Sequence, residues 1–269
     1  MKVVILMEDT CKVPGCEYEH GLSVYIETAK HKVLMDTGAS EKTLENAKKL
    51  GIDLYKVDAV IVSHGHSDHS GGILAFSQIN KAATVYMQRE ALGDYYHGER
   101  YIGVDKRIGQ LAGLRLLDGD HQIDEELSVF TGIRGRRFWP QSNLVLSMLK
   151  EGQRVQDEFA HEQCLMVRGE KELLISGCAH NGILNILDRY KEKYGRCPDV
   201  VVSGFHMMKK TDYTQEEKET ICRTAQELKE MDTLFYTGHC TGQKAIDLMG
   251  PIMGEKMVQI HCGMEVQIG

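Results

Sequence analysis

The sequence predicts an α/β protein built from two similar halves whose β-sheets face each other. Short apolar runs gather early in each half, and amphipathic segments follow them. No linker rich in Pro, Gly and Ser separates the halves, and no internal repeat or low-complexity tract is present. The 269 residues, 42% of them hydrophobic, suffice for a well-buried core. We therefore expect one domain over 1–269, with halves of roughly 1–125 and 126–269.

In the first half, β-rich runs predict strands, and one amphipathic segment predicts a helix over 39–52 that ends at a glycine. Leu44, Ala47 and Leu50 fall on one face of this helix at helical spacing. The expected strands cover 3–6, 22–27, 31–36 and 58–64.

The second half repeats this plan, with Thr214 as the N-cap of a long helix. The expected helices cover 181–195, 214–231 and 241–250. The expected strands cover 127–130, 144–149, 164–169, 172–177, 199–204, 233–238 and 256–262. The least regular stretch, about 89–143, is where we expect loops that cover a site.

Charge and targeting signals narrow the function class. The net charge of −7 argues against a nucleic-acid surface and against binding to anionic membranes, although Arg134, Arg136 and Arg137 form a local basic cluster. The N-terminal run turns acidic at once, and no signal peptide or spanning segment is recognisable. We expect a cytoplasmic protein whose eight cysteines are reduced thiols, most of them small buried residues. Cys178 and Cys240 are exceptions because they lie close to candidate site histidines.

The segment SHGHSDHSGG, residues 63–72, holds three histidines and an aspartate within six positions after an apolar strand. His64 and His66 are two residues apart, so in extended backbone they project to the same side. Asp68 and His69 follow, where a turn can aim them at a second point nearby. Imidazole and carboxylate ligands suit zinc, iron, manganese or cobalt better than calcium. The segment therefore predicts a site for two adjacent metal ions.

Three histidines in the second half share one local pattern, in which a strand ends, a glycine follows and a histidine comes next. The segments ELLISGCAH, DVVVSGFH and TLFYTGHC deliver His180, His206 and His239. A single histidine of this kind could be a satisfied core residue. Three in the same setting indicate groups gathered at one edge of a sheet.

These motifs resemble the metallo-β-lactamase-fold superfamily, in which H-x-H-x-D-H follows an apolar strand and an Asp-Thr-Gly strand end precedes it. The segments EHGLS, VLMDTG, NAKKLGIDL, SGCAHNGILN, SGFHM and TGHCTG are further similar to one branch. That branch includes dihydropterin ribofuranosyl-aminobenzene phosphate synthases of the tetrahydromethanopterin pathway and bacterial relatives of undefined substrate. The resemblance spans nearly the whole chain and implies a four-layer αββα sandwich with two facing mixed sheets.

The resemblance also implies a ligand set for two divalent metal ions, zinc first, with iron or manganese as alternatives. The first ion would be held by His64, His66 and His180, and the second by Asp68, His69 and His239. Asp36 would orient a ligand from behind, with His20 as a further candidate for such a role. Asp68 would also orient the metal-bound water. The single Asp-Thr-Gly does not indicate an aspartic protease, which needs two such carboxylates.

One position departs from the family pattern. Superfamily hydrolases usually place a metal-bridging aspartate after the strand that follows the third histidine, and here that strand ends SGFHM. His206 is the nearest candidate. It could replace the aspartate as a ligand, face the substrate as an acid, base or phosphate donor, or be a hydrogen-bonded structural histidine. The occupancy of the second metal site is therefore open.

Several residues outside these motifs are candidates for substrate binding. Arg136 and Arg137 could meet an anionic substrate, and Trp139 could stack on a flat ring such as a pterin; a surface turn with an anchored aromatic is the alternative. His161 could approach the site or lie at a solvated strand entry.

The expected activity is metal-dependent hydrolysis, or a related reaction of metal-bound water, on a small anionic substrate that is phosphorylated or pterin-like. The alternatives are a metal-dependent binding or sensing protein without turnover, a diiron redox enzyme and a nuclease. The redox reading lacks a carboxylate at the position of His66 and a flavin domain, and the acidic charge disfavours a nuclease. We expect neither a nucleic-acid nor a membrane partner, and a homo-oligomer is compatible with the sequence.

Overall fold

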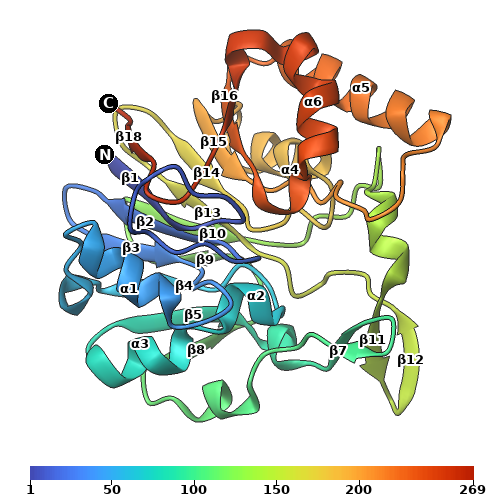
Figure 1. The fold of residues 1–269 in the computed structure, drawn as a ribbon. Coiled ribbons are helices and arrows are strands. Elements are labelled where there is room, and N and C mark those ends of the chain that lie inside the picture. The colour runs from blue at the N-terminus through green and yellow to red at the C-terminus, as the bar shows by residue number, and fades with distance from the viewer.

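Two seven-stranded sheets lie face to face with helices on their outer sides, which makes a four-layer αββα sandwich (Figure 1). The structure is a computed structural model that describes residues 1–269. The predicted fold class is thereby confirmed. The first sheet has the order β18 (Glu265–Gln267), β1 (Lys2–Met7), β2 (Ser23–Glu27), β3 (Lys32–Met35), β4 (Ala59–Ile61), β5 (Thr84–Gln88) and β8 (Leu114–Leu117).

The second sheet is built from the second half of the chain. Its order is β17 (Met257–Gln259), β16 (Leu234–Thr237), β15 (Val200–Ser203), β14 (Leu173–Ile175), β13 (Cys164–Val167), β10 (Leu127–Phe130) and β9 (His121–Gln122). In both sheets the central strands run parallel: β3, β4 and β5 in the first, and β14, β15 and β16 in the second. The carboxyl ends of such strands meet at one edge, where ligands bind in open α/β sheets.

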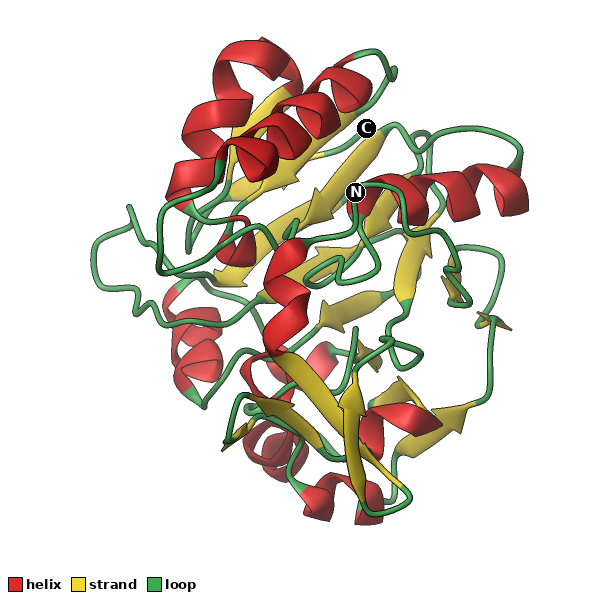
Figure 2. Ribbon diagram, turned by 90° about the vertical axis from the view of Figure 1, so that its right-hand side faces the viewer, coloured by secondary structure: helices red, strands yellow, loops and turns green.

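The helices cover the outer faces, and Figure 2 shows them on both sides of the paired sheets. The first sheet carries α1 (Lys42–Lys49) and α3 (Ile73–Ile79), and the second carries α4 (Ile183–Tyr194), α5 (Gln215–Lys229) and α6 (Gln243–Met253). The single turn α2 (Ser67–Ser70) lies within the histidine-rich segment. Short 3-10 turns are η1 (Leu54–Lys56), η2 (Arg89–Leu92), η3 (Lys106–Gln110), η4 (Gln141–Val145), η5 (His239–Thr241) and η6 (Gly254–Lys256).

Thr214 is the N-cap of α5, as predicted from the sequence. Its hydroxyl accepts a hydrogen bond from the Glu217 backbone N–H, and the Glu217 carboxylate accepts one from the Thr214 N–H. This capping box satisfies two backbone donors that the helix itself cannot pair.

Alternate residues of the strands face opposite layers. In β1, Val3 and Ile5 pack into the core between the two sheets, and Val4 and Leu6 pack under the helices of the first half. A strand that is buried on both faces reads as a continuous apolar run, as VVIL does. The central core contains 21 buried residues from both sheets and fixes the two halves against each other.

Several features of the fold were not predicted. The run 144–149 begins in the turn η4 and continues as β11 (Leu146–Lys150), which joins β12 (Gln153–Gln156), β6 (Tyr95–His97) and β7 (Arg100–Tyr101) in a separate four-stranded sheet. The terminal strand β18 returns to the first sheet and pairs with β1. The helix α3 and the strands β5, β8 and β9 were not anticipated. Strand pairing of this kind depends on long-range contacts, which a hydropathy pattern does not encode.

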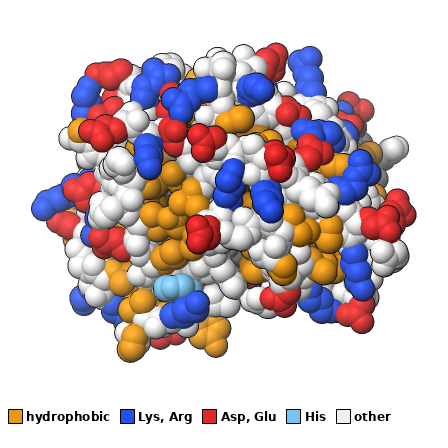
Figure 3. Space-filling model, turned by 90° about the horizontal axis from the view of Figure 1, so that it is seen from above, with side chains coloured by type: hydrophobic (Ala, Val, Ile, Leu, Met, Phe, Trp, Pro, Cys, Tyr) orange, Lys and Arg blue, Asp and Glu red, His pale blue; other side chains and the backbone are white.

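No helix has the length and apolar character that crossing a membrane requires. On the face seen in Figure 3, acidic and basic side chains are interspersed, and hydrophobic side chains show between them.

Candidate metal centre

The predicted site residues gather at the edge where the parallel strands of both sheets end. Asp36 follows β3 and the histidine-rich segment follows β4. Cys178 and His180 follow β14, and His239 follows β16. The two halves therefore bring their strand ends to one place, as the shared local pattern predicted.

His64 and His180 form the first pair of candidate ligands. Their Nε2 atoms lie 3.2 Å apart, and both side chains are buried. The Nδ1 atom of His180 lies 3.0 Å from the Asn143 amide oxygen, which can only accept, so this nitrogen carries the proton. The Nδ1 atom of His64 lies 2.7 Å from the Ser63 hydroxyl, which donates its own proton to Asp36. In both neutral rings Nε2 is therefore a free lone pair.

His69 and His239 form the second pair in the same way. Their Nε2 atoms are also 3.2 Å apart. The Nδ1 atom of His69 is 2.7 Å from the Asp36 carboxylate, and that of His239 is 2.6 Å from the Asp9 carboxylate. Each carboxylate accepts a hydrogen bond from Nδ1–H, which directs the Nε2 atom towards a bound cation.

The donor set fits metal ions. Two nitrogens bound tetrahedrally to zinc at ~2.0–2.1 Å stand ~3.3 Å apart, close to the spacing of both pairs. Burial and the neighbouring imidazoles lower the pKa of His64 and of His180 well below the ordinary value, so both rings are neutral, as metal-binding imidazoles are. Burial opposes protonation of His239 as well, but Cys240, Asp68 and Asp9 raise its pKa well above the ordinary value. The second half of the site therefore favours a positive charge.

Asp68 lies against the second pair. Its Oδ2 atom is 3.5 Å from Nε2 of both His69 and His239. Burial favours the protonated carboxyl, but these imidazoles outweigh it and hold the pKa of Asp68 well below its usual range. Asp68 is thus an anionic oxygen at the predicted second metal position.

His66 stands next to the first pair. Its ring centroid is 4.5 Å from that of His64 and 4.8 Å from that of His180. Its Nε2 atom is buried and has no hydrogen-bond partner. By ligand-atom distances alone, His66 groups with Asp157 and His161. The orphaned nitrogen is the kind of buried group that a metal ion would satisfy.

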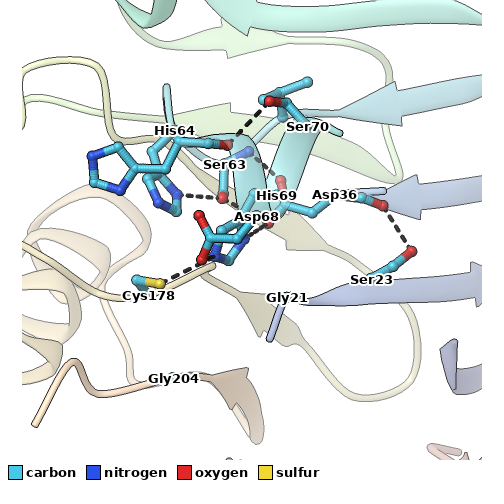
Figure 4. Close-up of polar contacts among 12 residues, drawn as sticks. Gly21, Ser23, Asp36, Ser63, His64, Asp68, His69, Ser70, Cys178 and Gly204 are labelled. Atoms are coloured by element: carbon cyan, nitrogen blue, oxygen red, sulfur yellow. Dashed lines mark hydrogen bonds and ion pairs between the residues drawn. The ribbon is translucent and has the colours of Figure 1, made fainter. Parts of the chain in front are cut away.

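Asp36 connects the two halves of the site from behind, and its side chain is fully buried. Its Oδ1 atom accepts the Ser63 backbone N–H at 2.7 Å, and its Oδ2 atom accepts the Ser63 hydroxyl at 2.6 Å (Figure 4). The same Oδ2 atom accepts Nδ1–H of His69. One carboxylate therefore orients His69 directly and His64 through Ser63.

The strand ends that carry the site have strained backbone. Asp36, Ala179, His206 and His239 all adopt positive φ angles, between 47° and 60°. Residues other than glycine rarely occupy this left-handed region, and when they do they cluster at functional sites. A hydrogen bond stabilises the strained conformation of His239: its backbone N–H donates to the Glu8 carboxylate at 2.6 Å.

His206 lies beside the first pair, with its ring centroid 4.1 Å from that of His180. The Ser142 hydroxyl is 2.8 Å from Nδ1 of His206 and also donates to the His206 carbonyl. Nδ1 therefore carries the proton, and Nε2 remains a free acceptor. Burial, followed by the nearby His66 and His239, lowers the pKa of His206 to about 3.

His161 is buried and holds the turn of the histidine-rich segment. Its Nδ1 atom accepts the Gly65 backbone N–H at 2.9 Å, and its Nε2 atom lies 3.1 Å from the Asp157 carboxylate. The neighbouring Glu162, also buried, accepts the backbone N–H groups of His180 and Asn181. Both side chains are therefore buried and hold the backbone of the segments that carry the candidate ligands, and neither lies at a solvated strand entry.

The two arginines differ in their surroundings. Arg137 pairs with Asp188 and Glu227, on α4 and α5. Arg136 contacts only neutral acceptors, among them the Asn181 side chain at 3.1 Å. Its guanidinium carbon lies 6.0 Å from the ring centroid of Trp139. Arg136 therefore keeps an unneutralised positive charge next to the loop that carries His180.

Trp139 is linked to the site through one aromatic residue. Its ring lies 6.1 Å from that of Phe159, which stacks on His180 at 4.4 Å with an interplanar angle of 5°. The Trp139 indole N–H is buried and has no hydrogen-bond partner.

His20 lies at the outer side of the second pair. Its ring stacks on that of His239 at 4.6 Å, and its Nδ1 atom is 2.8 Å from Asp9. Its Nε2 atom is 3.6 Å from the Asp68 carboxylate. The side chain is 49% exposed, so it links the buried pair to solvent.

Sequence reasoning missed the residues that support the ligands from behind. Asp9, Ser63 and Asn143 each contact the Nδ1 atom of a candidate ligand histidine. The acidic pair Glu8–Asp9 directly after β1 was a usable signal, because polar residues at strand ends reach the same edge. Asn143 lies in an irregular stretch and gave no such signal.

Comparison with known proteins agrees with this geometry. The family model of the metallo-beta-lactamase superfamily matches residues 18–138. The uncharacterized protein MJ0448 of Methanocaldococcus jannaschii is 30% identical over 257 residues, which are 93% of this chain and 94% of that protein. A second protein of that organism, 7,8-dihydropterin-6-methyl-4-(beta-D-ribofuranosyl)-aminobenzene-5'-phosphate synthase, is 28% identical over 91% of this chain and 88% of its own.

A solved structure is similar over the full chain. Tm1679, described as a metal-dependent hydrolase of the beta-lactamase superfamily, is 32% identical with a TM-score of 0.83 and covers 100% of this chain and 99% of its own. Its similarity extends to both halves of the sandwich. The chain belongs to the metallo-β-lactamase superfamily of metal-dependent hydrolases.

Proposed function

We propose that this protein is a hydrolase that uses a metal-activated water on a small anionic substrate, either phosphorylated or pterin-like. The observation that carries the proposal is the two pairs of Nε2 atoms, each 3.2 Å apart and each backed by a hydrogen-bond acceptor on Nδ1. Two such pairs at one sheet edge are an arrangement for two divalent ions, with zinc the best match to the imidazole-rich set.

His64, His66 and His180 would hold one ion, and Asp68, His69 and His239 the other. When bound, such ions lower the pKa of a bound water towards neutrality and polarise a carbonyl or phosphoryl oxygen. The side chains of this protein orient the reacting groups through hydrogen bonds. Asp68 supplies a carboxylate that accepts a hydrogen bond from the water, and His206 presents a free Nε2 atom that can accept a hydrogen bond from the reacting groups.

The anionic character of the substrate is inferred from Arg136. This side chain carries a charge that no carboxylate neutralises. It lies over the Trp139 ring and contacts Asn181, the residue after His180. A guanidinium beside an aromatic ring suits a ligand that combines a phosphate or carboxylate with a flat ring. The relative named as a phosphate synthase of a dihydropterin compound supports the same substrate class.

The test is a substrate panel on purified protein loaded with zinc, manganese or iron. We expect turnover of a phosphoester or carboxylate-bearing ester that requires the metal and falls with His64→Ala. Arg136→Gln should raise KM for anionic substrates and leave that for neutral esters unchanged. Arg137→Gln is the matched control, because its partners already neutralise that arginine.

Metal binding without turnover of any ester, phosphoester or amide would refute hydrolysis and support the alternative of a metal-dependent binding protein. Equal effects of the two arginine substitutions would refute the assignment of Arg136.

A further inference from the structure

The strand β15 ends where a shared metal ligand would be expected, but no carboxylate follows it, and the first residue after the strand is Gly204. A Cβ atom built on Gly204, the first residue after β15, would lie 2.4 Å from the Sγ atom of Cys240. This contact excludes a carboxylate at residue 204 unless Cys240 moves. The next residue, Phe205, is buried in the core of the second half, and the His206 ring lies beside His180 with its Nδ1 atom at Ser142.

Cys178 occupies the space between the two ligand pairs instead. It follows β14 and is 3% exposed. Its Sγ atom lies 3.1 Å from Nε2 of His69, and Figure 4 shows the sulfur directed towards Asp68 and His69. The thiol is thus aimed at the predicted metal positions rather than into the apolar core.

The ligand atoms form two groups, and Cys178 belongs to both. In one group, the Sγ atom and the ligand atoms of Asp68, His69 and His239 all lie within 4.8 Å of one another. In the other group, the same Sγ atom lies within 4.8 Å of the nitrogens of His64 and His180. A sulfur and a nitrogen on one tetrahedral zinc ion stand ~3.6 Å apart, so these separations are within reach of shared coordination.

A second observation points to a ligand at this place. The Nε2 atom of His66 is buried without a partner, and its ring lies against those of His64 and His180. A buried polar nitrogen left unpaired costs free energy that a bound cation would recover. The unpaired nitrogen of His66 belongs to a ring beside His64 and His180, and the Cys178 thiol lies close to the same two residues.

We propose that Cys178 is a metal ligand, a thiolate shared between the two ions in the role that a carboxylate usually fills. On coordination the thiol proton leaves to solvent and the sulfur lone pairs form the metal bonds, with no change of oxidation state. A soft sulfur ligand favours zinc or iron over manganese or magnesium. The inference rests on the proposed function only in requiring that metal binds at this edge.

The test is zinc K-edge X-ray absorption on the full-length protein loaded with zinc, together with metal analysis. We expect a sulfur shell at ~2.3 Å beside a nitrogen and oxygen shell at ~2.0–2.1 Å. Cys178→Ser and Cys178→Ala should lose the sulfur shell and bind at least one of the two ions tenfold more weakly. Cys240→Ser is the matched control: it changes a neighbouring buried cysteine outside both groups and should keep the shell.

Three results separate the possible failures. Wild-type protein that binds zinc through nitrogen and oxygen alone would overturn this inference and leave the proposed metal centre standing. A sulfur shell that persists in Cys178→Ala would overturn it as well. Wild-type protein that binds no zinc, iron or manganese would refute the metal centre itself. The wild-type spectrum decides the question even if a Cys178 variant does not fold.

Discussion

Asp36 offers the sharpest test of how the ligands are held, through the substitution Asp36→Asn. The carboxylate accepts three hydrogen bonds, two from Ser63 and one from His69. Asparagine has nearly the same shape and tolerates the positive φ angle of 60° at this position. Its amide group, however, presents N–H donors where the Ser63 hydroxyl and His69 Nδ1–H also donate.

The expected consequence is a loss of metal affinity. Without an acceptor, His69 can move its proton from Nδ1 to Nε2, which blocks the lone pair that faces His239. Replacing a hydrogen-bond partner of a metal ligand typically costs about 10–100-fold in affinity. This corresponds to roughly 1.4–2.8 kcal/mol at 25 °C.

Competition with a chromophoric chelator measures the zinc affinity directly. Asp124→Asn is the matched control, because Asp124 forms a similar contact, 2.6 Å, with His31 away from the site. We expect the control to bind zinc as the wild type does. An Asp36→Asn variant whose zinc affinity stays within twofold of wild type would refute the orienting role of Asp36.

Two further predictions concern packing and pH. Gly177→Ala should weaken zinc binding and destabilise the fold by ~1–3 kcal/mol in urea unfolding, because the added Cβ would lie 2.2 Å from the Ser63 hydroxyl; unchanged stability and affinity would contradict the packing argument. Burial opposes the protonation of His31, but its contacts with Asp124 and Asp58 outweigh burial and raise its pKa above 6.5. Its stabilisation is therefore fully present below pH 6.5 and is lost as the pH rises through the raised pKa of the folded state. The difference in unfolding free energy between wild type and His31→Ala should shrink along that rise, and a pH-independent difference would be the contrary result.

Local patterns were enough to predict most of the regular structure. Apolar runs of period two and amphipathic runs of period 3.6 reflect which face of an element is buried, and this information is local. The strand over 127–130 was predicted with the bounds that the structure shows, and the N-cap at Thr214 was predicted with its residue. The sequence also places His64, His66, Asp68 and His69 within six positions after a strand, and this local pattern was enough to predict a metal site.

The sequence by itself predicted the family, the types of the candidate ligands and the strand ends that carry them. The tertiary structure decided which groups meet. That Asp9 supports His239, and that Asn143 supports His180, depends on contacts across 230 and 37 residues of chain. The position of the Cys178 sulfur also depends on the tertiary structure. Cys178 lies between the two histidine pairs only because β14 of one sheet and β4 of the other end at the same edge. Composition and periodicity record the burial of each residue, whereas the packing of the two sheets sets the distances between residues that are remote in the chain.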